Sequence, residues 1–89
     1  MTQDEWMKKL AAEGFKELEV CTFGPDQEFP DHTHNELTAH VLLEGELMVQ
    51  DPSGAKTVRK GERFDVSAGT VHNAKCGPDG CSFIMGVKH

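Results

Sequence analysis

The amino-acid sequence predicts an all-β fold, a small antiparallel barrel or sandwich preceded by one short helix. The length of 89 residues is that of a single domain. Apolar residues recur at helical spacing near the start of the chain, and from residue 15 onward short apolar or alternating runs are separated by turn residues. Many short strands at regular spacing are typical of sandwiches and barrels. We therefore expect a helix within residues 1–14 packed on a β-barrel formed by residues 15–89.

The N-terminal helix is predicted from its start signal, its apolar face and its stop signal. Thr2 and Glu5 have the spacing of a capping box, in which two side chains satisfy free N–H groups at a helix start. Gly14 stands where a helix usually ends. The apolar face comprises Trp6, Met7, Leu10 and Ala11. This face should cover an apolar surface of the barrel.

The strands are predicted between groups of residues that turns require. They are expected at residues 15–23, 37–43, 46–50, 56–59, 63–66, 71–76 and 81–87. The segments 51–54 and 77–80 are rich in Gly, Pro and Asp, which supply turn conformations. The strand at 37–43 is apolar on both faces, so both must be covered. The inner face would line a cavity, and the outer face would meet the N-terminal helix or a second subunit; we expect a homodimer.

Charge and composition exclude several classes of function. The net charge is −6, with no separate basic cluster, which argues against a nucleic-acid partner. Uninterrupted apolar runs are short and the N-terminus is polar, so neither a membrane span nor a secretory signal is expected. Three cysteines, an odd number, fit reduced thiols better than a disulfide framework. A cytoplasmic location follows as an expectation.

A cluster of histidines suggests a metal site. His32 and His34 are separated by one residue, so on a strand both side chains would project from the same face. Pro30 before them and Asn35 after them place the pair near a strand end, where a site stays open to solvent.

Two segments of the chain together resemble the motifs of the cupin family. The first motif has HxH, a glutamate three or four residues on and a later glycine, here represented by HTHNELTAHVLLEG, which ends at Gly45. The second is represented by GERFDVSAGTVH, in which Gly61, Gly69 and His72 stand at the family's intervals. The resemblance covers residues 24–76 and implies an antiparallel jelly-roll β-barrel. It also implies that His32, His34 and His72 converge on one divalent metal ion: iron, zinc, manganese, nickel or copper.

The family's glutamate ligand is absent, because its position is occupied by Thr38. Three alternatives remain for the fourth ligand. His40 lies two residues further along the same strand face and could reach the ion, or orient the other ligands as a hydrogen-bonded neighbour. Glu36 could supply a carboxylate instead. A site of three histidines completed by water is the third alternative.

The cavity should be mostly apolar, lined by aromatic and sulfur-containing residues. The expected lining and core residues are Phe23, Phe29, Phe64, Phe83 and either Met48 or Met85. Cys76 alternates onto the same side as His72, so its thiol either faces the cavity or packs as a small apolar group. Cys76 and Cys81 flank a predicted turn, across which a reversible disulfide is conceivable, whereas Cys21 is expected to be structural.

The resemblance to cupins implies two classes of function. The first is a metal-dependent enzyme acting on a small molecule, of dioxygenase or of isomerase or hydrolase type. The second is a non-catalytic binding or sensor module in which the metal stabilises a small barrel. Fold alone does not decide between them.

Overall fold

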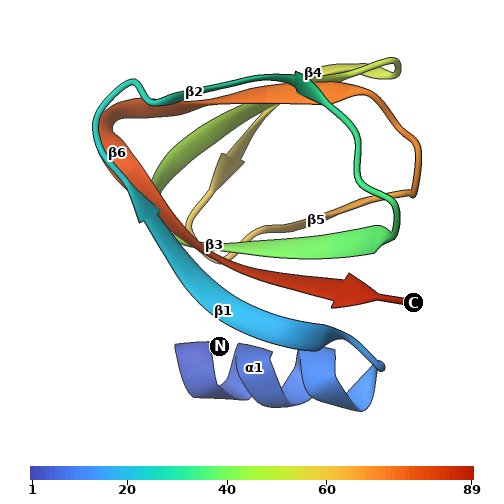
Figure 1. Ribbon diagram of the computed structural model, residues 1–89. Coiled ribbons are helices and arrows are strands. Elements are labelled where there is room, and N and C mark those ends of the chain that lie inside the picture. The colour runs from blue at the N-terminus through green and yellow to red at the C-terminus, as the bar shows by residue number, and fades with distance from the viewer.

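The computed structural model describes all 89 residues, as one helix and six antiparallel strands (Figure 1). The elements are α1 (Gln3–Ala12), β1 (Lys16–Phe23), β2 (Glu28–His32), β3 (Leu37–Asp51), β4 (Gly54–Arg59), β5 (Arg63–Val66) and β6 (His72–Lys88). The predicted capping box is present, because the Thr2 side chain accepts from the N–H of Glu5 and the Glu5 side chain accepts from that of Thr2. No helix is both long and apolar enough to cross a membrane.

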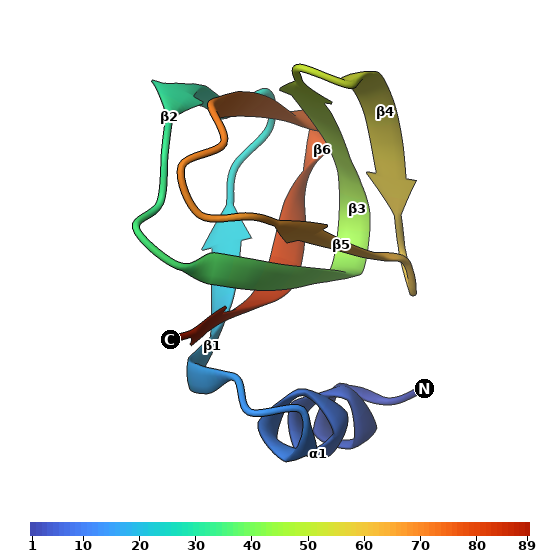
Figure 2. The ribbon, with the colours of Figure 1, turned by 90° about the vertical axis from the view of Figure 1, so that its right-hand side faces the viewer.

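The long strands β3 and β6 pair with each other and run through both halves of the barrel (Figures 1 and 2). In one half, β1 pairs with the C-terminal part of β6, and β5 pairs with the N-terminal part of β3. In the other half, β2 pairs with the start of β6, and β4 pairs with the end of β3. Each long strand therefore belongs to two antiparallel groups, and the interior lies between those groups.

Strands β3 and β6 bend at positions that face each other in the ladder. The register between them shifts around Gly45, which pairs with Cys81, while Leu47 pairs with Cys76, so residues 77–80 project from the ladder. Gly45 and Gly80 have φ angles of +73° and +80°, which favour glycine. A side chain at Gly45 would also collide with the backbone carbonyl of Gly80. Close backbone contact therefore requires glycine at both positions, at Gly45 because β6 is near and at Gly80 because the carbonyl of Phe23 in β1 is near.

A disulfide joins Cys76 and Cys81 across the base of this projecting segment. Their Cα atoms are 5.6 Å apart, although a fully extended strand would separate them by about 16 Å. Both residues are buried, with 0% and 4% of their surface exposed. The expectation of reduced thiols is therefore wrong for this pair, and the disulfide that the sequence left open across this turn is present, because the bend brings the two thiols together. Cys21 is the free cysteine.

The boundaries of several predicted strands differ from the structure. The predicted pairs 37–43 with 46–50, and 71–76 with 81–87, are each one continuous strand, because the turn residues between them bend the ladder without ending it. Strand β2 (Glu28–His32) was not among the predicted strands. Only a few residues of it pair with β6, and the segment lacks a regular alternation of apolar side chains.

The hydrophobic residues form an interior cluster and an outer cluster. The interior cluster comprises Leu42, Leu47, Val49, Val58, Phe64, Val66, Cys76, Cys81 and Phe83. In the outer cluster, Leu10 of α1 and Phe15 pack against Ala39, Val41 and Ile84. The helix, which lies beneath β1 in Figure 1, thus covers the outer face of β3. Of the two predicted partners of this face, the N-terminal helix or a second subunit, the structure shows the helix. Because the helix already covers this face, the face gives no evidence for a second subunit, and the homodimer stays a prediction.

Charged side chains fasten the end of α1 to the barrel. Arg63 of β5 donates to both carboxylate oxygens of Glu13, at 2.8 and 2.7 Å, and also pairs with Asp65. The hydrogen bonds from Arg63, together with that from Lys9, lower the pKa of Glu13 from 4.5 to about 2. The Arg63 guanidinium also lies 5.6 Å from the centre of the Phe15 ring. The helix is therefore held by an ion pair and by apolar packing.

The disulfide leads to a first prediction. Without a reductant, the unfolded protein should show one reactive thiol per chain, that of Cys21, and reduction should release the other two. Reduction should also lower the free energy of unfolding by about 2 kcal/mol, because the disulfide closes a short loop and so restricts the conformations of the unfolded chain. Thiol titration and urea denaturation measure both effects. A Cys21→Ala variant should have no reactive thiol before reduction, and three reactive thiols in the unreduced wild-type protein would contradict the prediction.

The ion pair leads to a second prediction, on pH dependence. Because the pKa of Glu13 is lower in the folded protein than its ordinary value of 4.5, its stabilising contribution is complete above that pH. The contribution is lost as the pH falls toward about 2. Glu13→Gln should therefore have a lower thermal midpoint than the wild type at pH 6, and the difference should vanish near pH 2. Glu28→Gln, which removes a carboxylate outside any ion pair, should show no such difference.

Candidate metal centre

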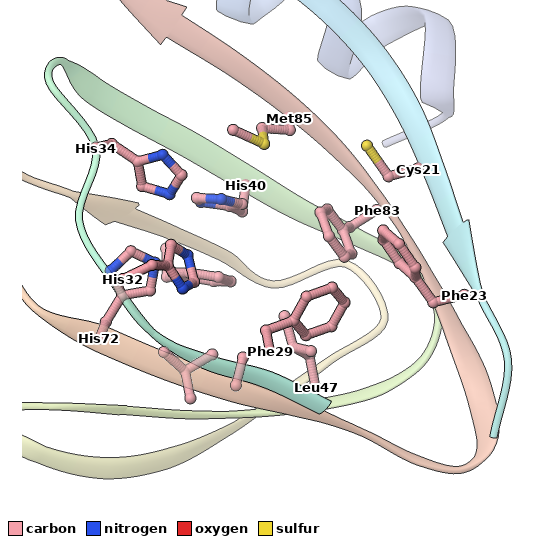
Figure 3. Close-up of a pocket in the computed structure, with 13 residues that line it drawn as sticks. Cys21, Phe23, Phe29, His32, His34, His40, Leu47, His72, Phe83 and Met85 are labelled. Atoms are coloured by element: carbon pink, nitrogen blue, oxygen red, sulfur yellow. The ribbon is translucent and has the colours of Figure 1, made fainter. Parts of the chain in front are cut away.

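The three histidines of the predicted site come from two strand ends and a loop. His32 is the last residue of β2, and His72, the first residue of β6, is its pairing partner across the ladder. His34 lies beyond the end of β2, in the connection to β3. The expectation that His32 and His34 share the face of one strand is therefore wrong for His34, because strand pairing ends at His32. The loop nevertheless returns the His34 ring to the other two (Figure 3).

The three imidazoles form one compact group. Their ligand atoms all lie within 4.8 Å of one another. The ring centres are 4.2 Å apart for His32 and His72, 5.0 Å for His32 and His34, and 5.1 Å for His34 and His72. Imidazole nitrogens bind zinc at about 2.1 Å, so one ion can bridge nitrogens spaced on this scale. The residues therefore fit a divalent metal ion.

Backbone carbonyls orient two of the rings. Nδ1 of His32 lies 2.7 Å from the carbonyl oxygen of Pro30, and Nδ1 of His72 lies 3.3 Å from that of Thr70. A carbonyl can only accept, so each Nδ1 carries the proton and each Nε2 retains a free lone pair. This is the usual support for metal-binding histidines, whose other nitrogen donates to a carbonyl or carboxylate. The fold thus supplies both the ligands and their tautomers.

The segments that carry the histidines are also tied together. The N–H of Gly69 donates to the carbonyl of His34 at 2.9 Å, which links the two loops. Beside the ladder pair, the Asn73 side chain donates to Asp31 at 2.8 Å. Asp31 and Asn73 are the neighbours of His32 and His72 in sequence. These bonds restrain both the loop that carries His34 and the strand pair that carries His32 and His72.

The group contains no carboxylate. Burial lowers the pKa of His34, and the nearby His72 and His32 lower it further, so the free protein favours the neutral imidazole. A neutral histidine is the form that binds metal. Three neutral ligands leave the full positive charge of a bound divalent ion uncompensated.

An apolar cavity of about 180 Å³ opens beside the histidines (Figure 3). It is lined by Cys21, Phe23, Phe29, His32, His34, His40, Leu47, Val49, Phe64, His72, Ala74, Phe83 and Met85. The phenylalanines predicted from the sequence are all in this wall, as is Met85, whereas Met48 is 42% exposed. The cysteine in the wall is Cys21, whose pKa is raised by burial, and not Cys76.

This chain was compared with family models, curated proteins and solved structures. No family model matches the sequence, and no curated protein matches it. Solved structures do match. A cupin-2 domain protein from Shewanella frigidimarina covers 81% of this chain, and 69% of its own, at 18% identity and a TM-score of 0.69. A cupin superfamily protein from Desulfitobacterium hafniense covers 81% and 66% of the two chains at 12% identity, with a TM-score of 0.72. The chain has the cupin fold.

A further cupin-fold match is KdgF from Halomonas sp., which covers 81% of this chain and 67% of its own at 16% identity and a TM-score of 0.69. These matches confirm the predicted small antiparallel jelly roll, and the structure of this chain shows the predicted short N-terminal helix. Their low identities carry the fold alone, so the chemistry must be argued from this chain's own side chains.

Neither Thr38 nor Glu36 belongs to the histidine group. Thr38 is completely buried and its hydroxyl has no hydrogen-bond partner. Oε2 of Glu36 lies 2.9 Å from Nδ1 of His89, at the end of the chain. The structure therefore brings no carboxylate to the position that Thr38 leaves without one.

His40 lines the cavity but lies outside the group of three. In Figure 3 it stands between those histidines and Phe83. Its ring stacks on that of Phe64, with centres 4.4 Å apart and planes 3° from parallel. Burial, and to a lesser extent His34 and His72, lower its pKa to about 4. His40 is thus a neutral imidazole in the cavity wall.

The geometry of this centre leads to a third prediction. His72→Ala should weaken zinc binding by at least about a hundredfold, because it removes one of three ligands. Changing a group that merely supports a ligand already weakens metal binding by about tenfold to a hundredfold. Isothermal titration calorimetry on protein first stripped with a chelator would measure this loss. His89→Ala is the matched control, since His89 is a histidine outside the group. Equal zinc affinities for the two variants would contradict the assignment.

Proposed function

We propose that this chain is a metal-dependent enzyme acting on a small molecule, with His32, His34 and His72 as the metal ligands. The observation that carries the proposal is the position of the three imidazoles, which converge beside an apolar cavity. A purely structural metal is usually enclosed by four protein ligands, whereas catalytic sites keep an open position. Three ligands beside a cavity match the second arrangement.

The donor set defines the chemistry that the site would support. A bound divalent ion would act as a Lewis acid, and iron, manganese or copper would add redox chemistry. Because the histidines carry no charge, the site would favour a substrate with an anionic or readily ionised group. The carbonyls of Pro30 and Thr70 fix the ring orientations, so the ligands are preorganised before substrate binds. Reaction types consistent with this site are oxygenation, isomerisation and hydrolysis.

The cavity limits the substrate to a small molecule. Its volume of about 180 Å³ slightly exceeds the 150 Å³ of an engineered apolar cavity that binds benzene. Phenylalanine rings enclose the end away from the histidines: Phe23 meets Phe29 edge to face at 4.8 Å and stacks on Phe83 at 5.7 Å. The substrate body would therefore be a single ring or a short branched chain.

A non-catalytic sensor is the second candidate. The observation that favours it is the shortage of acid and base groups, since the cavity wall contains no carboxylate and the chain has no tyrosine. Against a purely stabilising role for the metal, the barrel already has two hydrophobic clusters and a disulfide. The two functions therefore differ in whether the fold depends on the metal.

The fourth prediction separates these functions. Protein stripped of metal should keep its folded NMR spectrum, because the two hydrophobic clusters and the disulfide do not depend on an ion. When reloaded with Cu²⁺, its electron paramagnetic resonance spectrum should change on addition of azide, which binds only where a coordination position is open. Elemental analysis of freshly purified protein would identify the native metal.

His72→Ala provides the control for this experiment and should show no azide-dependent copper signal. A metal-free protein that unfolds, together with a copper spectrum that azide leaves unchanged, would support the sensor and refute the enzyme.

A further inference from the structure

We propose that His40 is a ligand-recognition residue, which binds a hydroxyl group on the apolar body of the small molecule held in the cavity. This inference deepens the proposed function and rests on it for the view that the cavity is the substrate site. It assigns His40 a role other than metal binding. The argument comes from the burial, the position in the cavity wall and the rigid placement of this side chain.

His40 is a buried polar group in the cavity wall. Only 6% of its surface is exposed, and its Nδ1 atom has no hydrogen-bond partner. By contrast, His32 and His72 have carbonyl partners. The Nδ1 atom of His40 is enclosed by the protein beside the backbone of Phe64, so a molecule in the cavity would bind the ring through its other nitrogen, Nε2.

Neighbouring strands hold the ring in a fixed position. His40 pairs with Phe64 of β5 on one side and with Met85 of β6 on the other. Its ring is parallel to that of Phe64 and lies 5.8 Å from that of Phe83. A ring restrained in this way loses little freedom when a ligand binds, which favours specific recognition.

The surroundings of His40 select the chemistry of the ligand group. Apart from the three clustered histidines and the Cys21 thiol, every other residue in the wall is apolar. A carboxylate buried against such a wall would need a charged partner, which a neutral imidazole does not provide. A neutral imidazole has one donor and one acceptor, and a hydroxyl can satisfy either. The matching ligand is an alcohol or a phenol with an apolar body.

The test compares phenol with toluene, which have similar shape but differ in the hydroxyl group. NMR titrations would give the affinity ratio of the two probes for the wild type and for His40→Leu. We expect the ratio to shift against phenol by about fivefold or more in the variant, the loss typical of one neutral hydrogen bond. His40→Gln, which keeps a donor and an acceptor, should retain part of the preference. His40→Met replaces His40→Leu if the latter does not fold.

Each titration would be carried out on zinc-loaded and on zinc-free protein, so that the result does not depend on the metal site. A preference for phenol that persists without zinc supports recognition by His40. The inference is overturned if the ratio is the same in wild type and His40→Leu, or if the wild type binds neither probe. It is also overturned if His40→Leu loses zinc, because His40 would then be a metal ligand. Failure of the wild type to bind zinc would refute the metal-dependent function alone.

Discussion

The pairing of β3 with β6 is the constraint on which the structure depends. These strands are in contact along most of their length and belong to both halves of the barrel. Their shared bend at Gly45 and residues 77–80 turns one ladder into two facing layers. The interior cluster, the cavity and the site all lie between those layers. A change that removed the close contact at Gly45 would therefore disturb the cavity as well as the fold.

The candidate metal centre is a consequence of this arrangement. Since β6 begins at His72 and pairs there with His32, the ladder itself places two imidazoles side by side. The third arrives on a loop, fixed by a hydrogen bond from Gly69. Preorganisation by backbone groups limits the reorganisation that metal binding requires. The same pairing directs His40 into the cavity, while its neighbours Ala39 and Val41 pack outward against the helix.

Apolar packing and charge divide the work of holding the helix on the barrel. The apolar face of α1 covers one side of β3, and Glu13 at its C-terminal cap is bound by Arg63. The barrel interior contains a small cavity whose wall has few polar groups. The chemistry is thus concentrated in four histidines, three of which are grouped while the fourth stands apart.

The sequence by itself determined the class of fold, the capped helix, the phenylalanines of the cavity wall and the three histidines that the structure groups together. These follow from local periodicity and from motif intervals, both of which are properties of the linear chain. The tertiary structure alone decided that β3 and β6 are continuous, that Cys76 and Cys81 are bonded, and that His40 stands outside the histidine group. Each of these depends on how the two long strands bend and which residues then face each other. Such contacts join residues distant in the chain, so local patterns do not encode them.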